Sequence, residues 1–349
     1  MQRHVLLQSR APGCQQRRSR AGRRRALAPV ASTKQPGLAQ TSSFWRWRGH
    51  DVRFCTAGVV ENPDAPALVL VHGFGGNADH WRKNTGVLAA AGYRVYAVDL
   101  LGYGYSSKPS PGALGSLPNS VYNFENWGAQ LTDFCAAVCG GPAFIAANSV
   151  GGLASLQAAV DSAPLVRGIV ILNVSLRGLH ITKQPAFARP LIAAFQSLLR
   201  TSNLGQSFFA SVAQESSVRA VLREAYCDKS AVTDELVQCI LQPGLQPGAA
   251  SVFLDFISYS TGPLAEELLP RVRCPVLTVW GERDPWESCE LARVLYGPEA
   301  NPGVVKRFVA LPGVGHCPQD EAPHLVNPLL VSWVAECLAE EAASLTAAR

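Results

Sequence analysis

Ser149 is the first residue whose surroundings suggest chemistry. It follows the apolar run 144–147 and precedes two glycines, in FIAANSVGG. The run predicts a strand and the sequence after Ser149 predicts a helix, and a nucleophilic serine can occupy the sharp turn between two such elements. That turn requires small residues two positions away on either side. Gly151 meets this requirement, and Ala147 stands where the motif has glycine. Alone, the stretch is also compatible with an ordinary turn.

His316 is the candidate base for this serine. It lies in the loop LPGVGHCPQDEAP, just past the last predicted strand, 306–313. Ligands and catalytic groups in open α/β sheets gather at the carboxyl ends of strands. The alternative interpretation is a histidine in a surface turn. The other histidines have different expected settings: the N-terminal segment (His4), a loop by the first hairpin (His50), a strand end (His72), a helix start with an exposed or capping side chain (His80), the helical insertion (His180) and the last helix (His324).

Asp284 is the carboxylate expected to orient His316 and to stabilise its charged form. In WGERDPW it follows the predicted strand 275–281, again at a carboxyl end. An Asp-Pro turn is the alternative interpretation. Glu282 and Asp320 are weaker candidates, because Glu282 is closer to the strand end and Asp320 lies downstream of the histidine.

An oxyanion hole requires two backbone amides, one directly after the nucleophile and one from the loop after an earlier strand. Val150 and Phe74 are the predicted donors, Phe74 lying in HGFGG. Gly73 and Gly75 would let the backbone approach a bound substrate closely. The loop lacks the G-K-[ST] ending of a phosphate-binding loop and is no dinucleotide fingerprint.

The elements around these residues alternate between strand and helix patterns, which predicts an α/β fold with a mostly parallel central sheet and helices on both faces. The alternation stops between strands six and seven, where several helices are expected instead. We therefore predict a core over 44–175, a helical cap over 176–270 and the rest of the core over 271–345. Apolar stretches of the insertion, PLIAAFQSLL, FFASVA and VFLDFI, indicate an apolar pocket or, for most of them, packing of the cap on the core.

The chain order Ser149, Asp284, His316 is that of α/β-hydrolases and differs from the orders of the serine proteases. From Trp45 to Val334 the chain resembles the α/β-hydrolase superfamily, through LVHGFGGNADHWRKN, VDLLGYGYSSKP, NSVGG, VWGERDPW and GVGHCPQDEAP. Within it, the sequence is similar to plastid serine hydrolases of plants and algae related to pheophytinase and chlorophyll dephytylase. The resemblance implies a cap over the site and no cofactor. Trp286 and Trp81 match family aromatics; the resemblance implies that Trp286 binds substrate, and packing is the alternative role for each.

These features predict a serine hydrolase that cleaves a carboxylic ester with an apolar acyl or alcohol group through an acyl-enzyme. The resemblance points to a phytyl ester of a chlorophyll-type pigment. Similar motifs occur in haloalkane dehalogenases and epoxide hydrolases, but those use an aspartate where this chain has Ser149. Two alternatives stay open. One is C–C bond hydrolysis or elimination on the same triad, with Arg177 and Arg189 as a carboxylate-binding pair; the other is a receptor-like ligand-binding protein.

The first 31 residues hold eight arginines and no acid, and without them the formal charge falls from +5 to −3. Such a segment predicts an organellar transit peptide, with the chloroplast stroma as first destination and the mitochondrion as second. A basic arm for nucleic acid or anionic lipid is the alternative, and we expect no nucleic-acid partner. No run approaches the ~20 apolar residues of a membrane span. Peripheral contact with the thylakoid membrane is compatible with the resemblance, and the oligomeric state is left open. The ten cysteines include no Cys-x-x-Cys, so neither a metal site nor a disulfide framework is expected.

Overall fold

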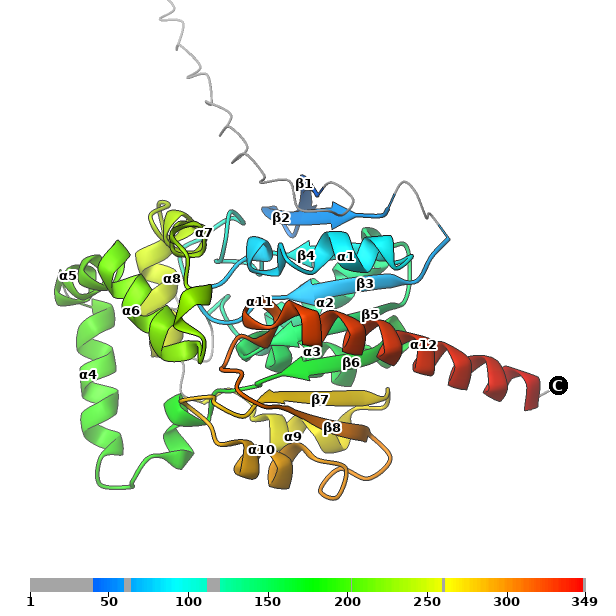
Figure 1. Cartoon of the computed structure of the whole chain (residues 1–349). Coiled ribbons are helices and arrows are strands. Elements are labelled where there is room, and N and C mark those ends of the chain that lie inside the picture. The colour runs from blue at the N-terminus through cyan, green and yellow to red at the C-terminus, as the bar shows by residue number, and fades with distance from the viewer. Residues whose placement is uncertain (1–39, 60–63, 112–119, 202, 259–260, 348–349) are drawn as a thin grey trace, which may run out of the picture. The chain divides into compact units, whose positions relative to one another are not determined.

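The computed structural model describes residues 40–59, 64–111, 120–201, 203–258 and 261–347. The predicted transit segment, 1–31, lies outside them. The described elements form an α/β structure with a single eight-stranded sheet, shown in Figure 1. The strands in chain order are β1 (Thr41–Trp47), β2 (His50–Ala57), β3 (Ala67–Val71), β4 (Arg94–Val98), β5 (Ala143–Asn148), β6 (Val166–Leu172), β7 (Val276–Gly281) and β8 (Val305–Leu311).

The sheet has the order β1-β2-β4-β3-β5-β6-β7-β8. β2 pairs antiparallel with both β1 and β4, and β3 to β8 pair in parallel. All residues of β3 and β5 are buried, because strands covered by helices on both faces carry continuous apolar runs. The predicted fold class is confirmed, and the sheet brings the carboxyl ends of β3, β5, β6, β7 and β8 to one edge.

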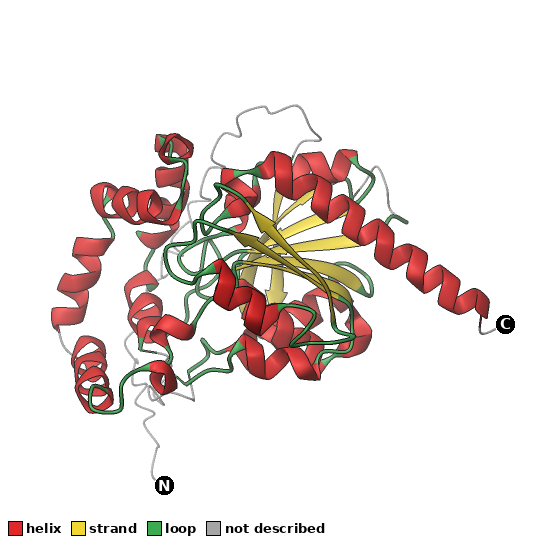
Figure 2. Ribbon diagram, turned by 60° about the horizontal axis from the view of Figure 1, so that its bottom comes forward, coloured by secondary structure: helices red, strands yellow, loops and turns green. Residues whose placement is uncertain are grey.

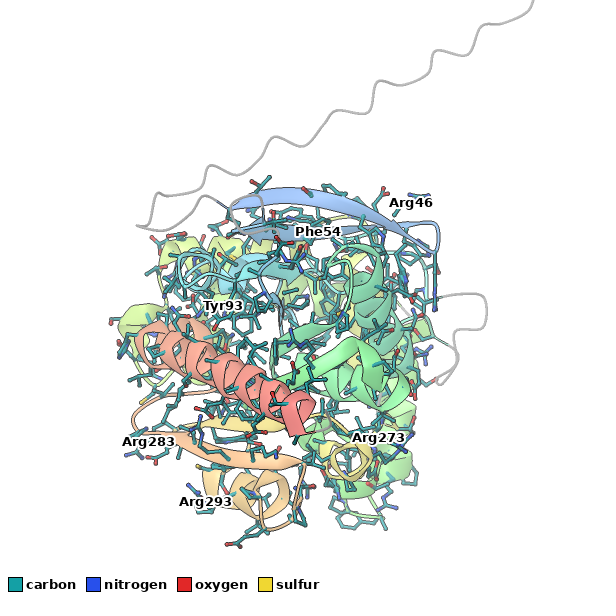
Figure 3. The ribbon with its side chains drawn as sticks, turned by 90° about the vertical axis from the view of Figure 1, so that its right-hand side faces the viewer. Arg46, Phe54, Tyr93, Arg273, Arg283 and Arg293 are labelled. Atoms are coloured by element: carbon teal, nitrogen blue, oxygen red, sulfur yellow. The ribbon has the colours of Figure 1, made fainter. Side chains whose placement is uncertain are left out.

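Two helical layers cover the sheet, one on each face, as Figure 2 shows. One apolar cluster joins the sheet to α2, α3, α9 and α10, and a second joins it to α1 and α12. Tyr93, labelled in Figure 3, donates a hydrogen bond to the carbonyl oxygen of Val331 in α12 (3.1 Å). These helices are α1 (Thr85–Ala90), α2 (Phe124–Ala137), α3 (Val150–Asp161), α9 (Ala265–Leu268), α10 (Cys289–Tyr296) and α12 (Pro323–Ala347).

Between β6 and β7 the chain forms the helical cap that the sequence predicts. Its helices are α4 (Arg189–Thr201), α5 (Asn203–Val212), α6 (Glu215–Ala225), α7 (Asp234–Gly244) and α8 (Ala249–Ile257). A small apolar cluster of α6 and α7 includes Cys317, which follows His316 directly. The short helix α9 lies within the predicted cap range, yet it packs against α3 of the core. None of the described helices combines the length and apolar character that crossing a bilayer requires.

The stretch 80–92, whose spacing is helical, forms two separate elements. The chain makes a 3₁₀ turn, Ala78–Trp81, and then the helix α1. Asn77 starts the first turn by accepting a hydrogen bond from the amide of Asp79. The side chain of Asn84 makes no capping hydrogen bond to α1; its Nδ2 donates to Oδ1 of Asn327 in α12 (2.7 Å). A local cap at Asn77 and a tertiary hydrogen bond at Asn84 therefore divide the helical pattern.

Candidate active site

Ser149 lies on a strained turn between β5 and α3. Its backbone has φ 54° and ψ −126°, a conformation that residues other than glycine rarely adopt. Such strain costs about 1–3 kcal/mol and persists only where the surrounding structure enforces it. The closely packed loop after β3 contributes to this enforcement: a Cβ on Gly73 would lie 2.9 Å from the Cβ of Ser149, and one on Gly151 would lie 2.3 Å from the carbonyl oxygen of His72.

Substituting Gly151 by alanine is expected to lower the free energy of unfolding by at least about 2 kcal/mol, because the added methyl group meets a backbone oxygen that cannot rotate away. Chemical denaturation would measure the loss. Gly244→Ala is the matched control, because a Cβ there meets nothing within 4 Å. Equal stabilities for the two variants would contradict the tight packing of this turn.

His316 and Asp284 form a buried pair at the same edge of the sheet. The Nδ1 atom of His316 lies 2.8 Å from Oδ2 of Asp284, and their side chains are 4% and 0% exposed. Burial alone would raise the pKa of Asp284, but hydrogen bonds from His316, Asn173 and the Trp286 amide, together with the His316 charge, lower it below its usual value. The aspartate is thus held ionised beside the imidazole, as an orienting carboxylate must be.

The two competing carboxylates have other settings. Glu282 is exposed. Asp320 is buried and accepts hydrogen bonds from Arg82, Lys83 and the hydroxyl of Tyr226. The only carboxylate bonded to the His316 ring among the described residues is Asp284.

Asn173 is a positioning residue that the sequence interpretation missed. Its Nδ2 donates to Oδ2 of Asp284 (2.7 Å), and its Oδ1 accepts from the amide of Gly281 (2.9 Å). It directly follows β6 with φ 45°. Its place after an apolar strand, at the edge that carries the other polar residues, is the signal that could have identified it.

Asn148 connects the turn at Ser149 to the loop that carries His316 through hydrogen bonds. Its Nδ2 donates to the carbonyl oxygens of His316 (2.9 Å) and Leu172 (3.1 Å), so the residue before Ser149 contacts His316 directly. In the described part of the chain the Ser149 hydroxyl forms no hydrogen bond with the His316 ring. Contacts of this kind are often long without substrate and tighten when it binds.

Of the predicted oxyanion donors, Val150 directly follows Ser149, and Phe74 follows Gly73, on which a Cβ would lie 2.9 Å from the Cβ of Ser149. Within the residues that the structure describes, no protein acceptor binds the amide of Phe74 or of Val150. The loop that carries Phe74 is fixed by His72, whose Nδ1 donates to the oxygen of Gly73 (2.7 Å) and whose Nε2 accepts from the amide of Leu100 (3.1 Å). Burial lowers the pKa of His72, which keeps the ring neutral for this role. Gly75 has a positive φ of 69°.

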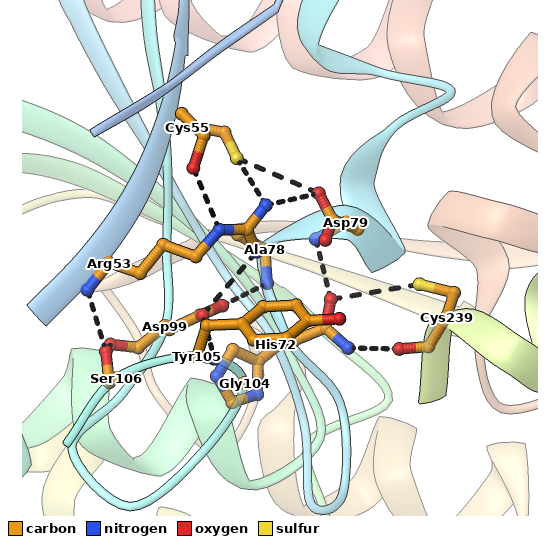
Figure 4. Close-up of polar contacts among 12 residues, drawn as sticks. Arg53, Cys55, His72, Ala78, Asp79, Asp99, Gly104, Tyr105, Ser106 and Cys239 are labelled. Atoms are coloured by element: carbon orange, nitrogen blue, oxygen red, sulfur yellow. Dashed lines mark hydrogen bonds and ion pairs between the residues drawn. The ribbon is translucent and has the colours of Figure 1, made fainter. Parts of the chain in front are cut away.

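A buried polar network, drawn in Figure 4, holds the next turn of the same loop. Arg53 donates to Oδ1 of Asp79 (2.8 Å) and lies 3.5 Å from Oδ2 of Asp99. Asp99 in turn accepts from the amide of Ala78 (2.6 Å). Asn77 donates to the carbonyl oxygen of Cys239 in α7 (2.8 Å), so the loop after β3 is also linked to the cap.

Aromatic side chains surround the site. The Trp286 ring is 47% exposed, and its centroid lies 4.4 Å from that of His316. Phe74 is 37% exposed and stacks on Phe256 of α8 at 4.6 Å. Phe253 lies 5.4 Å from Phe74 and 6.2 Å from Phe208 of α5. A series of aromatic contacts thus runs from the cap to Phe74 in the loop after β3.

The expectation of an exposed or capping His80 is wrong. Its ring is buried, and its Nε2 lies 2.8 Å from the hydroxyl oxygen of Tyr226, at the end of α6. Burial lowers its pKa to about 4. The neighbouring amide of His316 donates to the carbonyl oxygen of Ala225 (2.8 Å). His80 therefore helps to attach the cap helix α6 to the core, beside the loop that carries His316.

The buried carboxyl group of Glu287 should make the free energy of unfolding depend on pH. It is 6% exposed, and its Oε1 lies 3.2 Å from Nε of Arg177. Burial raises the pKa of its carboxyl to about 7, although the Arg177 charge opposes the shift. The folded protein therefore keeps this proton up to about pH 7, whereas an unfolded chain releases it near pH ~4. Raising the pH from about 5 to about 8 should accordingly remove roughly 2–3 kcal/mol of stability that Glu287→Gln would not lose.

Denaturation of both proteins across this pH range would measure the difference. Glu282→Gln, at an exposed carboxylate nearby, should keep the wild-type slope. Parallel curves for the wild type and Glu287→Gln would show that Glu287 does not retain its proton in the fold.

The mostly parallel eight-stranded sheet, the helical insertion after β6 and the polar residues at the carboxyl edge define an α/β-hydrolase fold. The profile of the Alpha/beta hydrolase family matches residues 68–329, and the chain belongs to this family. Among the described residues, no group of three His, Cys, Asp or Glu side chains is arranged to hold a metal ion.

Relatives within the family differ in their named activities. Chloroplastic pheophytinase of Arabidopsis thaliana is 27% identical over 324 residues, covering 78% of this chain and 62% of that protein, so the chain spans less than two thirds of its length. A 2-hydroxy-6-oxononadienedioate/2-hydroxy-6-oxononatrienedioate hydrolase of Pseudomonas sp is 25% identical, covering 77% and 87%. The solved structure of an alpha/beta hydrolase from Nostoc superposes with a TM-score of 0.69 at 19% identity, covering 84% and 98%.

Proposed function

We propose that this protein is a serine hydrolase of carboxylic esters that carry an apolar acyl or alcohol group. One observation carries the proposal: a serine with positive φ directly follows Asn148, which binds the loop of the buried His316–Asp284 pair. A structural serine in a turn has no need of this strained conformation.

In the proposed reaction, Ser149 attacks the ester carbonyl carbon while His316 takes the hydroxyl proton. Asp284 holds the imidazole in the required tautomer, and the amides of Phe74 and Val150 bind the oxygen that becomes negative. His316 then gives its proton to the leaving alcohol, which departs and leaves the acyl group on Ser149. Water, deprotonated by His316, then attacks the acyl carbon; the bond to the Ser149 oxygen breaks, His316 returns the proton to that oxygen, and the acid leaves.

The aromatic contacts of Phe74 favour an apolar substituent on the ester. Phe74 would place the oxyanion donor and an apolar surface side by side, since its ring packs on Phe253 and Phe256 of α8. Gly73, Gly75 and Trp286 would border the ester itself. The similarity to a chloroplastic pheophytinase supports a phytyl ester of a chlorophyll-type pigment as substrate and the plastid as location.

The alternative chemistry, C–C bond hydrolysis, would require a carboxylate-binding pair in the cap. Both sequence candidates already bind protein acceptors. Arg177 pairs with Glu266 and Glu287, and Arg189 donates to the backbone oxygens of Gln184 and Thr182 (both 3.1 Å). These contacts favour the ester hydrolase over the alternative.

Hydrolysis of p-nitrophenyl esters of increasing chain length tests the proposal. We expect activity that rises with acyl length and disappears in Ser149→Ala. Activity on a 2-hydroxy-6-oxo-dienoate with none on any ester would replace the proposal by the C–C alternative. Binding of a pigment ester without turnover, unchanged in Ser149→Ala, would indicate a receptor.

A further inference from the structure

The end of the cap helix α6 lies directly against the loop that carries His316. The amide of His316 donates to the carbonyl oxygen of Ala225 (2.8 Å). The preceding residue, Gly315, leaves no room for a side chain, because a Cβ there would lie 2.8 Å from the amide nitrogen of Cys227 and closer still to the oxygen of Ala225. We name residues 225–228 the cap joint. The backbone beside His316 therefore packs directly on the cap.

Glu321 connects the loop to the cap joint through both oxygens of its carboxylate. It is the last residue of the short helix α11 (Pro318–Glu321). Its Oε2 accepts from the amide of Gly315 (2.8 Å), and its Oε1 accepts from the amide of Asp228 (2.7 Å). Burial raises the pKa of this carboxyl, and its backbone donors oppose the shift. One side chain thus holds two backbone segments together, one from the core and one from the cap.

Tyr226 attaches the cap joint to the core. Its hydroxyl donates to Oδ2 of Asp320 (3.0 Å) and lies 2.8 Å from Nε2 of His80. All three side chains are buried, and Asp320 also accepts from Arg82 (2.6 Å). Buried polar networks whose members all have partners are rigid. The cap joint can therefore serve as a fixed support for the loop that carries His316.

His316 is held by the core and by the cap at different atoms. Its carbonyl oxygen accepts from Asn148 and its ring contacts Asp284, both in the core, whereas its amide contacts the cap joint. A displacement of the cap joint would turn the residue about its two core contacts and move Nε2 relative to Ser149. In a reacting site a misplacement of about 1 Å can cost about 10²-fold in rate. Proton transfer by His316 therefore depends on the support from the cap.

We infer that Glu321 is a positioning residue for the reaction proposed at Ser149: it holds the loop of His316 against the cap joint and so orients the imidazole for proton transfer. The inference rests on the proposed function, which assigns His316 as the base. Glu321 acts through the backbone of Gly315 and Asp228. A carboxylate that only stabilised the end of α11 would change the melting temperature and leave the rate constants of the folded protein unchanged.

Glu321→Gln tests this role in the full chain. The amide presents its NH₂ group to one of the two backbone donors, so one of the two contacts is lost. We expect kcat for a dissolved p-nitrophenyl ester to fall by about 10- to 100-fold, with KM within about twofold of the wild type, because the aromatic surface of the site is unchanged. Glu224→Gln, the same change at an exposed glutamate of α6, should keep wild-type kinetics.

A second variant tests the cap side of the same contact. Asp228 has φ −80°, which proline can adopt, so Asp228→Pro removes the amide that Glu321 binds and keeps that φ. Asp228→Ala removes the same side chain but keeps the amide, and it is the reference for the proline variant. We expect kcat to be about tenfold lower in Asp228→Pro than in Asp228→Ala, at temperatures where thermal melts show both to be folded.

Nitrogen NMR of histidine-labelled protein gives a measurement that does not require turnover. At alkaline pH, where imidazoles are neutral, the wild-type His316 should carry its proton on Nδ1, because Asp284 accepts from that atom. In Glu321→Gln the proton should be distributed over both ring nitrogens. The signals of His316 are those that disappear in His316→Gln.

Wild-type kcat in Glu321→Gln, even with a lower melting temperature, would overturn the positioning role and leave the proposed function in place. Equal kcat values for Asp228→Pro and Asp228→Ala would do the same. If the wild type hydrolyses no ester, the proposed function falls and the tautomer decides the rest: a His316 tautomer that changes in Glu321→Gln would support the positioning role, and an unchanged tautomer would overturn it too.

Discussion

Replacing Ser149 by alanine should lower kcat/KM for a dissolved apolar ester by about 10⁴-fold or more, because no other group in the site would form the acyl-enzyme. The substitution removes one oxygen from a residue that is 8% exposed, and alanine at the same φ keeps the backbone as it is. The melting temperature should therefore stay close to that of the wild type. Steady-state kinetics with a p-nitrophenyl ester and a thermal melt would measure both quantities.

Ser162→Ala is the matched control for this variant. Ser162 ends the same helix, α3, and its side chain makes no capping hydrogen bond, so wild-type activity is expected. Substantial ester hydrolysis by Ser149→Ala would contradict the assignment of the nucleophile.

Replacing Asp284 by asparagine should have the second largest effect, a loss of about 10³- to 10⁴-fold in kcat. Both carboxylate oxygens accept hydrogen bonds: Oδ2 from His316 and Asn173, and Oδ1 from the amide of Trp286. An asparagine presents an NH₂ group to one of these sets of donors. If the NH₂ group faces His316, the imidazole loses its acceptor and is no longer held in the productive tautomer. If it faces the amide of Trp286, the side chain loses the backbone hydrogen bond that positions it.

The same variant should also change the stability at low pH. The lowered pKa of Asp284 stabilises the fold above the pKa of an unfolded aspartate, and this contribution is lost as the pH falls through the lower folded value. Asp284→Asn lacks the contribution at any pH.

Kinetics with Glu282→Gln as control would separate the two neighbouring carboxylates, and an inactive Glu282→Gln beside an active Asp284→Asn would reverse their roles.

Several residues of the site could be placed from the sequence because each follows a strand. Ser149, Asp284 and His316 come after β5, β7 and β8, and parallel strands bring their carboxyl ends to one edge. Two further residues carry the same signal, but their hydrogen-bond partners could not be inferred from the sequence. Asn173 and Asn148 sit at the ends of apolar strands, and their partners, Asp284 and His316, are more than a hundred residues away.

The cap was predictable as a helical insertion but not as a surface. Apolar spacing in α4 indicates an amphipathic helix, whichever phase its apolar face meets. Only the three-dimensional arrangement shows that Gln196 and Leu199 face the protein while Leu191 and Phe195 stay exposed. The burial of His80 likewise depends on Tyr226, which lies 146 positions further along the chain.

Labelling with a fluorophosphonate tests the central claim most directly, because the reagent modifies serines that a neighbouring base activates. Intact-mass measurement and peptide mapping would identify the modified residue. We predict one added group per chain, located on Ser149, lost in Ser149→Ala and strongly slowed in Asp284→Asn. Labelling of Ser149→Ala at the wild-type rate, or modification at another serine, would contradict the assignment of Ser149 as the nucleophile.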